Sequence, residues 1–261
     1  MLRFFRALRR KLLEEDKVRT YFWYAIGEVF LVVIGILIAL QINNMNIERQ
    51  TREDEKTYLQ NLKRDLQINI RLLDEIIKYN EENLVSTSMV AAMSEQGKIE
   101  DIYAFIENIQ ITLMGGNLTP NQNTFEEMKS AGKLSLITND YIKQRLLVLD
   151  EQFIRIEGGE KHVQREYEQY IWDELVNVIS YREYSVMSEL REDLMFVTDT
   201  AYIERNKARM IREGEEILAN TRFQNGLYLY EMNYIYLNSV FKETKTMVTE
   251  LITLIDWVLA K

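Results

Sequence analysis

Residues 21–42 read YFWYAIGEVFLVVIGILIALQI, and this stretch decides how the chain is organised. Between Trp23 and Ile42 the only charged side chain is Glu28. A helix that rises ~1.5 Å per residue crosses the ~30 Å hydrocarbon core of a bilayer in about 20 residues, which is the length of this stretch. Aromatic residues gather at its start, where their amphipathic rings favour the headgroup boundary. The stretch therefore predicts one transmembrane helix over residues 21–43.

The charges on the two sides of this helix differ in sign. Residues 1–20 carry seven Lys or Arg residues against three Asp or Glu, although the whole chain has 32 basic and 41 acidic residues. Because basic residues beside a first span stay in the cytoplasm, we expect residues 1–20 to form a basic cytoplasmic tail and residues 44–261 an extracytoplasmic domain. In a bacterium this topology corresponds to the inner (cytoplasmic) membrane, with the C-terminal domain in the periplasm.

A cleavable signal peptide and a buried core helix are the alternatives to a membrane span. A signal peptide has a shorter apolar region that ends at a small-residue cleavage site. Here residues 39–42 (ALQI) lead straight into a polar segment, so we expect an uncleaved signal-anchor. Apolar residues also recur at helical spacing among the arginines of residues 2–13. This pattern suits either an amphipathic helix on the inner leaflet or a plain topology signal.

The predicted span contains three candidate functional residues. Glu28 is a carboxylate inside a membrane segment, which is costly, and such residues commonly serve as proton sites or interchain contacts. The alternative is that Glu28 lies shallowly, where it reaches headgroups or Arg19, or is simply protonated. Gly35 and Ala39 are small residues one turn apart, a spacing that lets a second helix approach closely. They are the candidate helix-contact residues.

Two short motifs carry a resemblance to a known family. Residues 24–44, YAIGEVFLVVIGILIALQINN, resemble the opening of a family of small single-span Bacteroidota membrane proteins of unknown function. Residues 125–139, FEEMKSAGKLSLITN, are similar to that family's aromatic, Ser-Gly-Lys-Leu and Leu-Ile-x-Asn stretch, with Ala131 as an extra or variable position. Met45 and Ile47 stand where the family usually has tryptophan and glutamate. The resemblance implies location and topology, and it implies no assigned reaction.

The composition favours an all-α fold. One proline and ten glycines in 261 residues leave few turns for a sheet, and 47% hydrophobic residues suffice for a substantial core. An apolar stripe at alternating three- and four-residue spacing predicts a long helix over residues 46–92, continuing the membrane helix. A wider stripe over residues 237–259 predicts a C-terminal helix that packs antiparallel against it and faces two neighbours. We therefore expect a long antiparallel helical bundle.

Shorter helices are predicted between the two stripes, over residues 99–113, 124–130, 140–157 and 160–179, with a last helix from residue 199 to the C-terminus. Thr124 and Glu127 have the spacing of a capping box. Gly132 suits a left-handed helix end, and Asn139 suits an N-cap. The pair Gly158-Gly159 indicates a break between two helices.

The sequence offers little catalytic chemistry. With no cysteine and one histidine, His162, it has no Cys-His site and no histidine-rich metal site, and only one residue could serve as the histidine of a Ser-His-Asp site. It contains no Glu-x-x-His pair, phosphate-binding glycine loop or calcium-loop pattern. An acidic domain repels phosphate, which argues against a nucleic-acid partner. We therefore expect no enzymatic activity, no catalytic residues, no metal and no cofactor.

Aromatic side chains give the only indication of a ligand site. Tyr230 and Tyr234 share a helix face, and Trp172 lies in another aromatic-rich segment, so these three are candidates for lining a cleft; core packing is the alternative. Two functions stay open. One is a membrane-anchored scaffold that contacts the bilayer and either its own copies or an envelope protein. The other is an extracytoplasmic sensory or small-ligand-binding module. Because only residues 1–20 precede the span, too few for a signalling domain, the scaffold is favoured.

Overall fold

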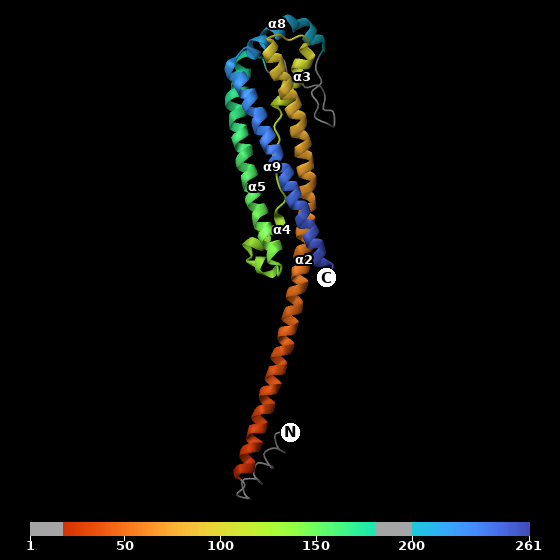
Figure 1. Cartoon of the computed structure of the whole chain (residues 1–261), viewed down its shortest axis with the longest axis vertical. Helices are drawn as coiled ribbons and strands as arrows, with labels where there is room; N and C mark the ends of the chain where they lie inside the picture. Colours follow the sequence, from red (N-terminus) through yellow and green to blue (C-terminus); the bar gives the residue numbers. More distant parts are fainter. Residues whose placement is uncertain (1–17, 181–199) are drawn as a thin grey trace. The chain divides into compact units, whose positions relative to one another are not determined.

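The computed structural model describes residues 18–180 and 200–261, which form an all-α fold (Figure 1). The structure is 89% helical, and no strand occurs in the described ranges. The amphipathic segment predicted at residues 2–13 lies outside them. The elements in chain order are α2 (Val18–Gln96), α3 (Ile102–Leu113), α4 (Asn123–Ser130), the 3-10 turn η1 (Lys133–Leu136), α5 (Asp140–Glu166), the π-helical turn η2 (Tyr167–Trp172), α6 (Asp173–Val178), α8 (Thr200–Leu218) and α9 (Thr221–Leu259).

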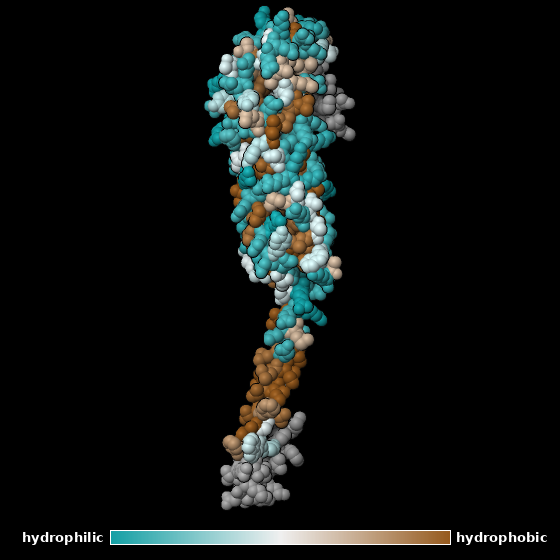
Figure 2. Space-filling view, in the orientation of Figure 1, coloured by the Kyte–Doolittle hydropathy of each residue, from teal (hydrophilic) through white to brown (hydrophobic). Residues whose placement is uncertain are grey.

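The chain divides into two compact units, Met1–Thr57 and Tyr58–Lys261, and α2 contributes residues to both. In the first unit, α2 contains an apolar stretch with a mean hydropathy of 2.5, none of which is buried. Figure 2 shows this stretch as a brown band around a single helix. It belongs to the one helix, among the described residues, that is long and apolar enough to cross a membrane, which indicates a membrane anchor. The predicted boundaries at residues 21 and 43 stay predictions.

In the second unit, α9 runs antiparallel to α2, as predicted. Four polar pairs join the two helices, and the residue number on α9 falls as the number on α2 rises. We call this line of contacts the α2–α9 seam. Its pairs are Lys63 with Asp256 (2.5 Å), Asp74 with Lys245 (2.5 Å), Glu81 with Lys242 (2.7 Å) and Ser88 with Glu231 (2.7 Å).

The C-terminal helix α9 also has the predicted second neighbour, because α5 packs along it. The buried amide of Gln152 on α5 donates to the hydroxyl of Thr244 on α9 (3.2 Å). The wide apolar stripe predicted over residues 237–259 is therefore largely buried, and each fully buried aliphatic or aromatic side chain contributes about 1.5–3 kcal/mol to folding. The buried members are Leu237, Val240, Phe241, Thr244, Val248, Leu251 and Ile255.

One row of α2 faces the core with strict three- and four-residue spacing. Its apolar members are buried, and it also carries buried asparagines. Asn69 exchanges two hydrogen bonds with the backbone of Asn121 (2.9 and 2.6 Å), and Asn83 donates to the backbone oxygens of Ile111 and Met114 (2.8 and 2.7 Å). These amides hold the segment between α3 and α4 against α2. The row consists of Leu59, Leu62, Leu66, Asn69, Leu73, Ile76, Asn80, Asn83, Thr87 and Val90.

The predicted capping box at Thr124 is wrong, whereas the two turn residues after it are confirmed. Helix α4 begins after Gln122, which makes no side-chain cap, and the backbone N–H of Thr124 donates to the carboxylate of Asp65 on α2 (2.8 Å). A tertiary contact thus replaces the local one. Gly132 has a left-handed backbone (φ 67°), and the side chain of Asn139 caps α5.

The predicted break at Gly158-Gly159 is also wrong, because α5 continues through both glycines to Glu166. A Cβ atom on Gly159 would lie 2.9 Å from Cδ2 of Leu237. The glycine therefore serves close packing of α5 against α9 rather than a turn, and tertiary burial outweighs the low helix propensity of glycine, about 1 kcal/mol per residue.

The expected single helix from residue 199 to the C-terminus is two helices. Helix α8 ends at Leu218, and α9 begins at Thr221. The side chain of Asn220 forms the boundary, because it accepts hydrogen bonds from the backbone N–H groups of Arg222 and Phe223 (2.8 and 3.1 Å). Asparagine is a favoured N-cap residue, so Asn220 could have indicated this helix boundary from the sequence alone.

Candidate ligand pocket

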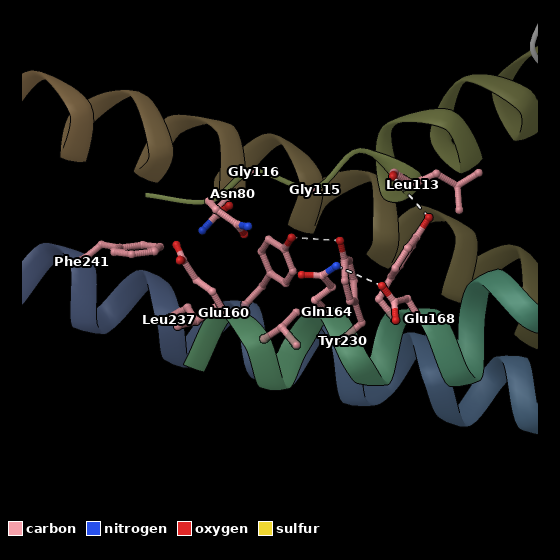
Figure 3. A pocket seen from close by; sticks show the side chains of 14 residues that line it. Asn80, Leu113, Gly115, Gly116, Glu160, Gln164, Glu168, Tyr230, Leu237 and Phe241 are labelled. Carbon is pink, nitrogen blue, oxygen red and sulfur yellow. Dashed lines mark hydrogen bonds between the residues drawn. The ribbon is translucent and has the colours of Figure 1, made fainter. Parts of the chain in front are cut away.

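A pocket of about 230 Å³ lies within the second unit, lined by α2, the segment that follows α3, the end of α5, η2 and α9 (Figure 3). Its volume is below the range of about 300–1,000 Å³ that is typical of drug-sized ligands, so it suits a small molecule. The lining combines apolar and aromatic side chains with a few polar groups. The residues on which its chemistry depends are Asn80, Glu160, Tyr167, Tyr230, Tyr234 and Phe241.

The predicted pair Tyr230 and Tyr234 lies in this pocket. The two residues are one turn apart on α9, and their ring centroids are 4.4 Å apart. The hydroxyl of Tyr230 donates to that of Tyr234 (2.9 Å), and both side chains are buried. Burial raises the pKa of each hydroxyl, so both tyrosines stay neutral at any physiological pH. They offer rings and hydrogen-bonding hydroxyls rather than charge.

The carboxylate of Glu160 on α5 is the buried acidic group of the pocket, and that of Glu168 on η2 also lines it. The side chain of Glu160 is only 7% exposed, and Oε1 accepts a hydrogen bond from the backbone N–H of Leu118 (2.7 Å). Burial raises the pKa of Glu160 to about 7, and the nearby carboxylate of Glu157 adds to the rise, whereas the bond from Leu118 opposes it. Near neutral pH this carboxyl group is therefore balanced between its neutral and charged forms.

The side chain of Asn80 on α2 is the polar group that the fold leaves incomplete. It is 1% exposed and lines the pocket, and its Oδ1 atom has no hydrogen-bond partner among the described residues. Asn69 and Asn83, which occupy equivalent positions of the same row, both bind backbone groups. A buried acceptor without a donor costs about 1–3 kcal/mol. Asn80 therefore presents an unfilled acceptor to the pocket.

The third predicted residue, Trp172, lies outside the pocket lining. Its half-buried ring packs near that of Tyr167, with centroids 6.5 Å apart, and Tyr167 in turn lies 5.9 Å from Tyr230. Trp172 supports the aromatic cluster from the α6 end of η2, and only Tyr230 and Tyr234 of the predicted three reach the pocket.

The sequence analysis did not identify Glu160 and Asn80 as candidate site residues, although each lies at a core position of a helical pattern. Asn80 falls on the core row of α2. Glu160 falls on a row of α5 with the same spacing, which its neighbours Phe153, Ile156 and Val163 occupy as buried residues. A polar side chain at a core position of a helix indicates either a hydrogen bond inside the fold or a binding site. Because a helix break was expected at Gly158-Gly159, the core-facing row that runs across these residues of α5 was not recognised.

The candidate residues of the predicted span lie in the first unit. Glu28, Gly35 and Ala39 are all exposed on α2. Nothing lies within 4 Å of the position of a Cβ atom on Gly35, and Ala39 follows one turn later, so this small-residue face is open along the helix. These positions stay candidates for membrane function and helix contact.

The described residues contain no group of three or more His, Cys, Asp or Glu side chains that could hold a metal ion. His162 lies on the surface of α5, where its Nε2 atom is 3.2 Å from the carboxylate of Glu166 and its Nδ1 atom is 2.8 Å from the guanidinium of Arg165. This arrangement is an ordinary surface contact of a solvated helix face.

The described residues define the class of the protein: it is an all-helical bundle in which the long helix α2 carries an exposed apolar stretch. The chain belongs to a family of unknown function, DUF6090, whose pattern matches residues 28–168. The matched range contains Asn80 and Glu160 and ends before Tyr230 and Tyr234. No curated protein and no solved structure matches the chain. The predicted membership of a family without an assigned reaction is thereby confirmed.

Proposed function

We propose that this protein is a non-enzymatic scaffold of the bacterial envelope, anchored in the inner membrane, with residues 1–20 in the cytoplasm and residues 44–261 in the periplasm. The observation that carries the proposal is the uncovered apolar stretch of α2, because a helix whose whole circumference is apolar requires lipid or protein around it. The basic residues before this stretch and the acidic excess after it support the orientation. The Bacteroidota origin that the two motifs suggest agrees with such an envelope.

A contact surface for a partner is available on the bundle. Exposed apolar side chains lie on α2 and α9 on both sides of the Ser88–Glu231 contact of the α2–α9 seam. Contiguous exposed apolar side chains on a soluble surface commonly mark protein interaction sites. We call them the seam patch, and they are Val85, Met89, Tyr228, Met232 and Ile235.

The orientation can be tested by cysteine labelling, because the chain has no cysteine of its own. We expect Lys78→Cys, on an exposed part of α2, to react with a membrane-impermeant maleimide in intact spheroplasts. Arg10→Cys, in the basic tail, should react only after the membrane is permeabilised. The unmodified chain is the blank. Labelling of Arg10→Cys in intact spheroplasts, with Lys78→Cys protected, would reverse the proposed topology.

The scaffold role can be tested by photo-crosslinking of the full chain in native membranes. Benzoylphenylalanine at position 235, inside the seam patch, is expected to yield one dominant adduct, either a dimer of this chain or a complex with one envelope protein. The same group at the exposed position of Lys78, outside the patch, should yield several-fold less of that adduct. Mass spectrometry identifies the partner. If neither a self-adduct nor a specific protein adduct forms at position 235, the scaffold proposal fails.

A further inference from the structure

The pocket contains hydrogen-bond acceptors that have no donor among the described residues. Among the described residues, the buried Oδ1 atom of Asn80 has no hydrogen-bond partner, and Glu160 accepts a hydrogen bond at Oε1 but not at Oε2. Figure 3 shows Asn80 and Glu160 reaching into the same part of the pocket from facing helices. When Glu160 is ionised, which is its main form above about pH 7, both atoms are acceptors. A molecule that fills this space must therefore bring hydrogen-bond donors.

The charge of the lining selects among such donors. Among the described residues that line the pocket, Glu160 and Glu168 are carboxylates, and none is Lys, Arg or His. An anion would meet like charge in a poorly solvated site, where repulsion is least screened. A neutral donor would satisfy Asn80 but would leave the charge of Glu160 without a counterion. A cation satisfies both groups.

The aromatic residues of the lining favour the same class of ligand. Tyr167, Tyr230, Tyr234 and Phe241 line the same pocket as the two acceptors. Aromatic rings attract cations through their negative faces and also pack against carbon chains. The cation–π contacts seen among the described residues involve rings outside the pocket: Phe125, Tyr58, Tyr141, Tyr236, Tyr170 and Trp257.

We propose that this pocket binds a small protonated amine, with Asn80 and Glu160 accepting hydrogen bonds from the ammonium group and the aromatic residues contacting its carbon chain. This ligand class goes beyond the scaffold role, because an anchored bundle needs no bound small molecule. The pocket lies wholly within the second unit, between α2 and α9, so an occupied pocket would join helices on its two sides through one ligand.

The proposal can be tested by calorimetric titration of the full chain in lipid nanodiscs with matched probes. Four amines are titrated: methylamine, butylamine, 1,4-diaminobutane and 2-phenylethylamine. Two further compounds resemble 2-phenylethylamine but differ in charge: 2-phenylethanol is neutral and phenylacetate is an anion. At least one amine is expected to bind saturably, and 2-phenylethylamine should bind at least about tenfold more tightly than the alcohol. Phenylacetate should not bind. Absence of binding by all four amines, or equal binding of amine and alcohol, would overturn the proposal.

Three variants distinguish amine binding in the pocket from amine binding to the acidic surface. Glu160→Gln keeps the shape of the side chain but removes its charge, and it should weaken amine binding by about tenfold or more. Asn80→Leu removes the unfilled acceptor and should weaken binding by about tenfold. Glu151→Gln makes the same charge change at an exposed position of α5 and should leave binding unchanged. Equal effects of Glu151→Gln and Glu160→Gln would place the amine on the acidic surface and contradict the pocket assignment. A thermal unfolding curve of each variant verifies that it is folded.

Discussion

Replacing Gly226 with alanine is expected to lower the free energy of unfolding by at least about 2 kcal/mol. Gly226 lies in α9 where the π-helical turn η2 crosses it. A Cβ atom there would lie 2.7 Å from Cβ of Tyr170 and 2.9 Å from its backbone oxygen. The colliding atoms belong to the backbone and to the first side-chain atom, so no rotation of a side chain relieves the contact. The two helical elements must move apart, which loosens the packing of η2 against α9.

The matched control is Gly158→Ala, another glycine inside a helix. Nothing lies within 4 Å of a Cβ atom at Gly158. The free energy of unfolding of this variant should therefore rise by about 0.5–1 kcal/mol, because alanine has a higher helix propensity than glycine. Both variants gain the same propensity, and their difference therefore measures the close approach at Gly226. Denaturant unfolding of the full chain in detergent, followed by circular dichroism, gives both values. Similar stabilities of the two variants would contradict the packing described here.

The second large effect is expected at Glu160, whose pKa of about 7 in the folded protein compares with an ordinary value of 4.5. Between these two values the unfolded chain loses its proton before the folded protein does. The contribution of Glu160 to the free energy of unfolding should therefore be highest below about pH 4.5 and fall as the pH rises to about 7. Since one pKa unit corresponds to about 1.4 kcal/mol, the loss attributable to Glu160 is about 3–4 kcal/mol.

Glu160→Gln removes this loss, because the amide stays neutral and its oxygen can still accept the hydrogen bond from Leu118. The variant should be about 3–4 kcal/mol more stable than the parent at about pH 8 and similar to it at about pH 4. The titratable group next to Glu160 on α5 is Glu157, which pairs with Lys161, and α9 faces it with the neutral Tyr234. The exposed variant Glu151→Gln is the control and should show no such pH dependence. A constant difference between parent and Glu160→Gln across the pH range would contradict the burial of this carboxylate.

The long helices were predictable because their signal is periodic and repeated many times. The stripe that predicted a helix over residues 46–92 recurs through the bundle part of α2, and the C-terminal stripe from residue 237 recurs to the end of α9. The end of α2 at Gln96, four residues beyond the predicted end, leaves the period intact. The antiparallel pairing followed, because each wide apolar face must be buried against another.

The errors came from residues whose role is set by a distant neighbour. Gly158 and Gly159 look alike in sequence, yet only Gly159 is pressed against Leu237. Thr124 has the spacing of a capping box, but Asp65 of α2 takes its backbone N–H. In each case local propensity is worth about 1 kcal/mol or less, and one tertiary contact outweighs it.

By itself, the sequence determined the all-α class, the apolar stretch that suits a membrane span, and the charge asymmetry across it. These features depend on composition and on spacing along a single helix, which no other segment can change. Only the tertiary structure decided that Asn80, Glu160, Tyr230 and Tyr234 meet in one pocket and that Trp172 stays outside it. The reason is physical: whether a buried polar atom is satisfied depends on groups that the other helices bring to it, and α2, α5 and α9 are far apart in the chain.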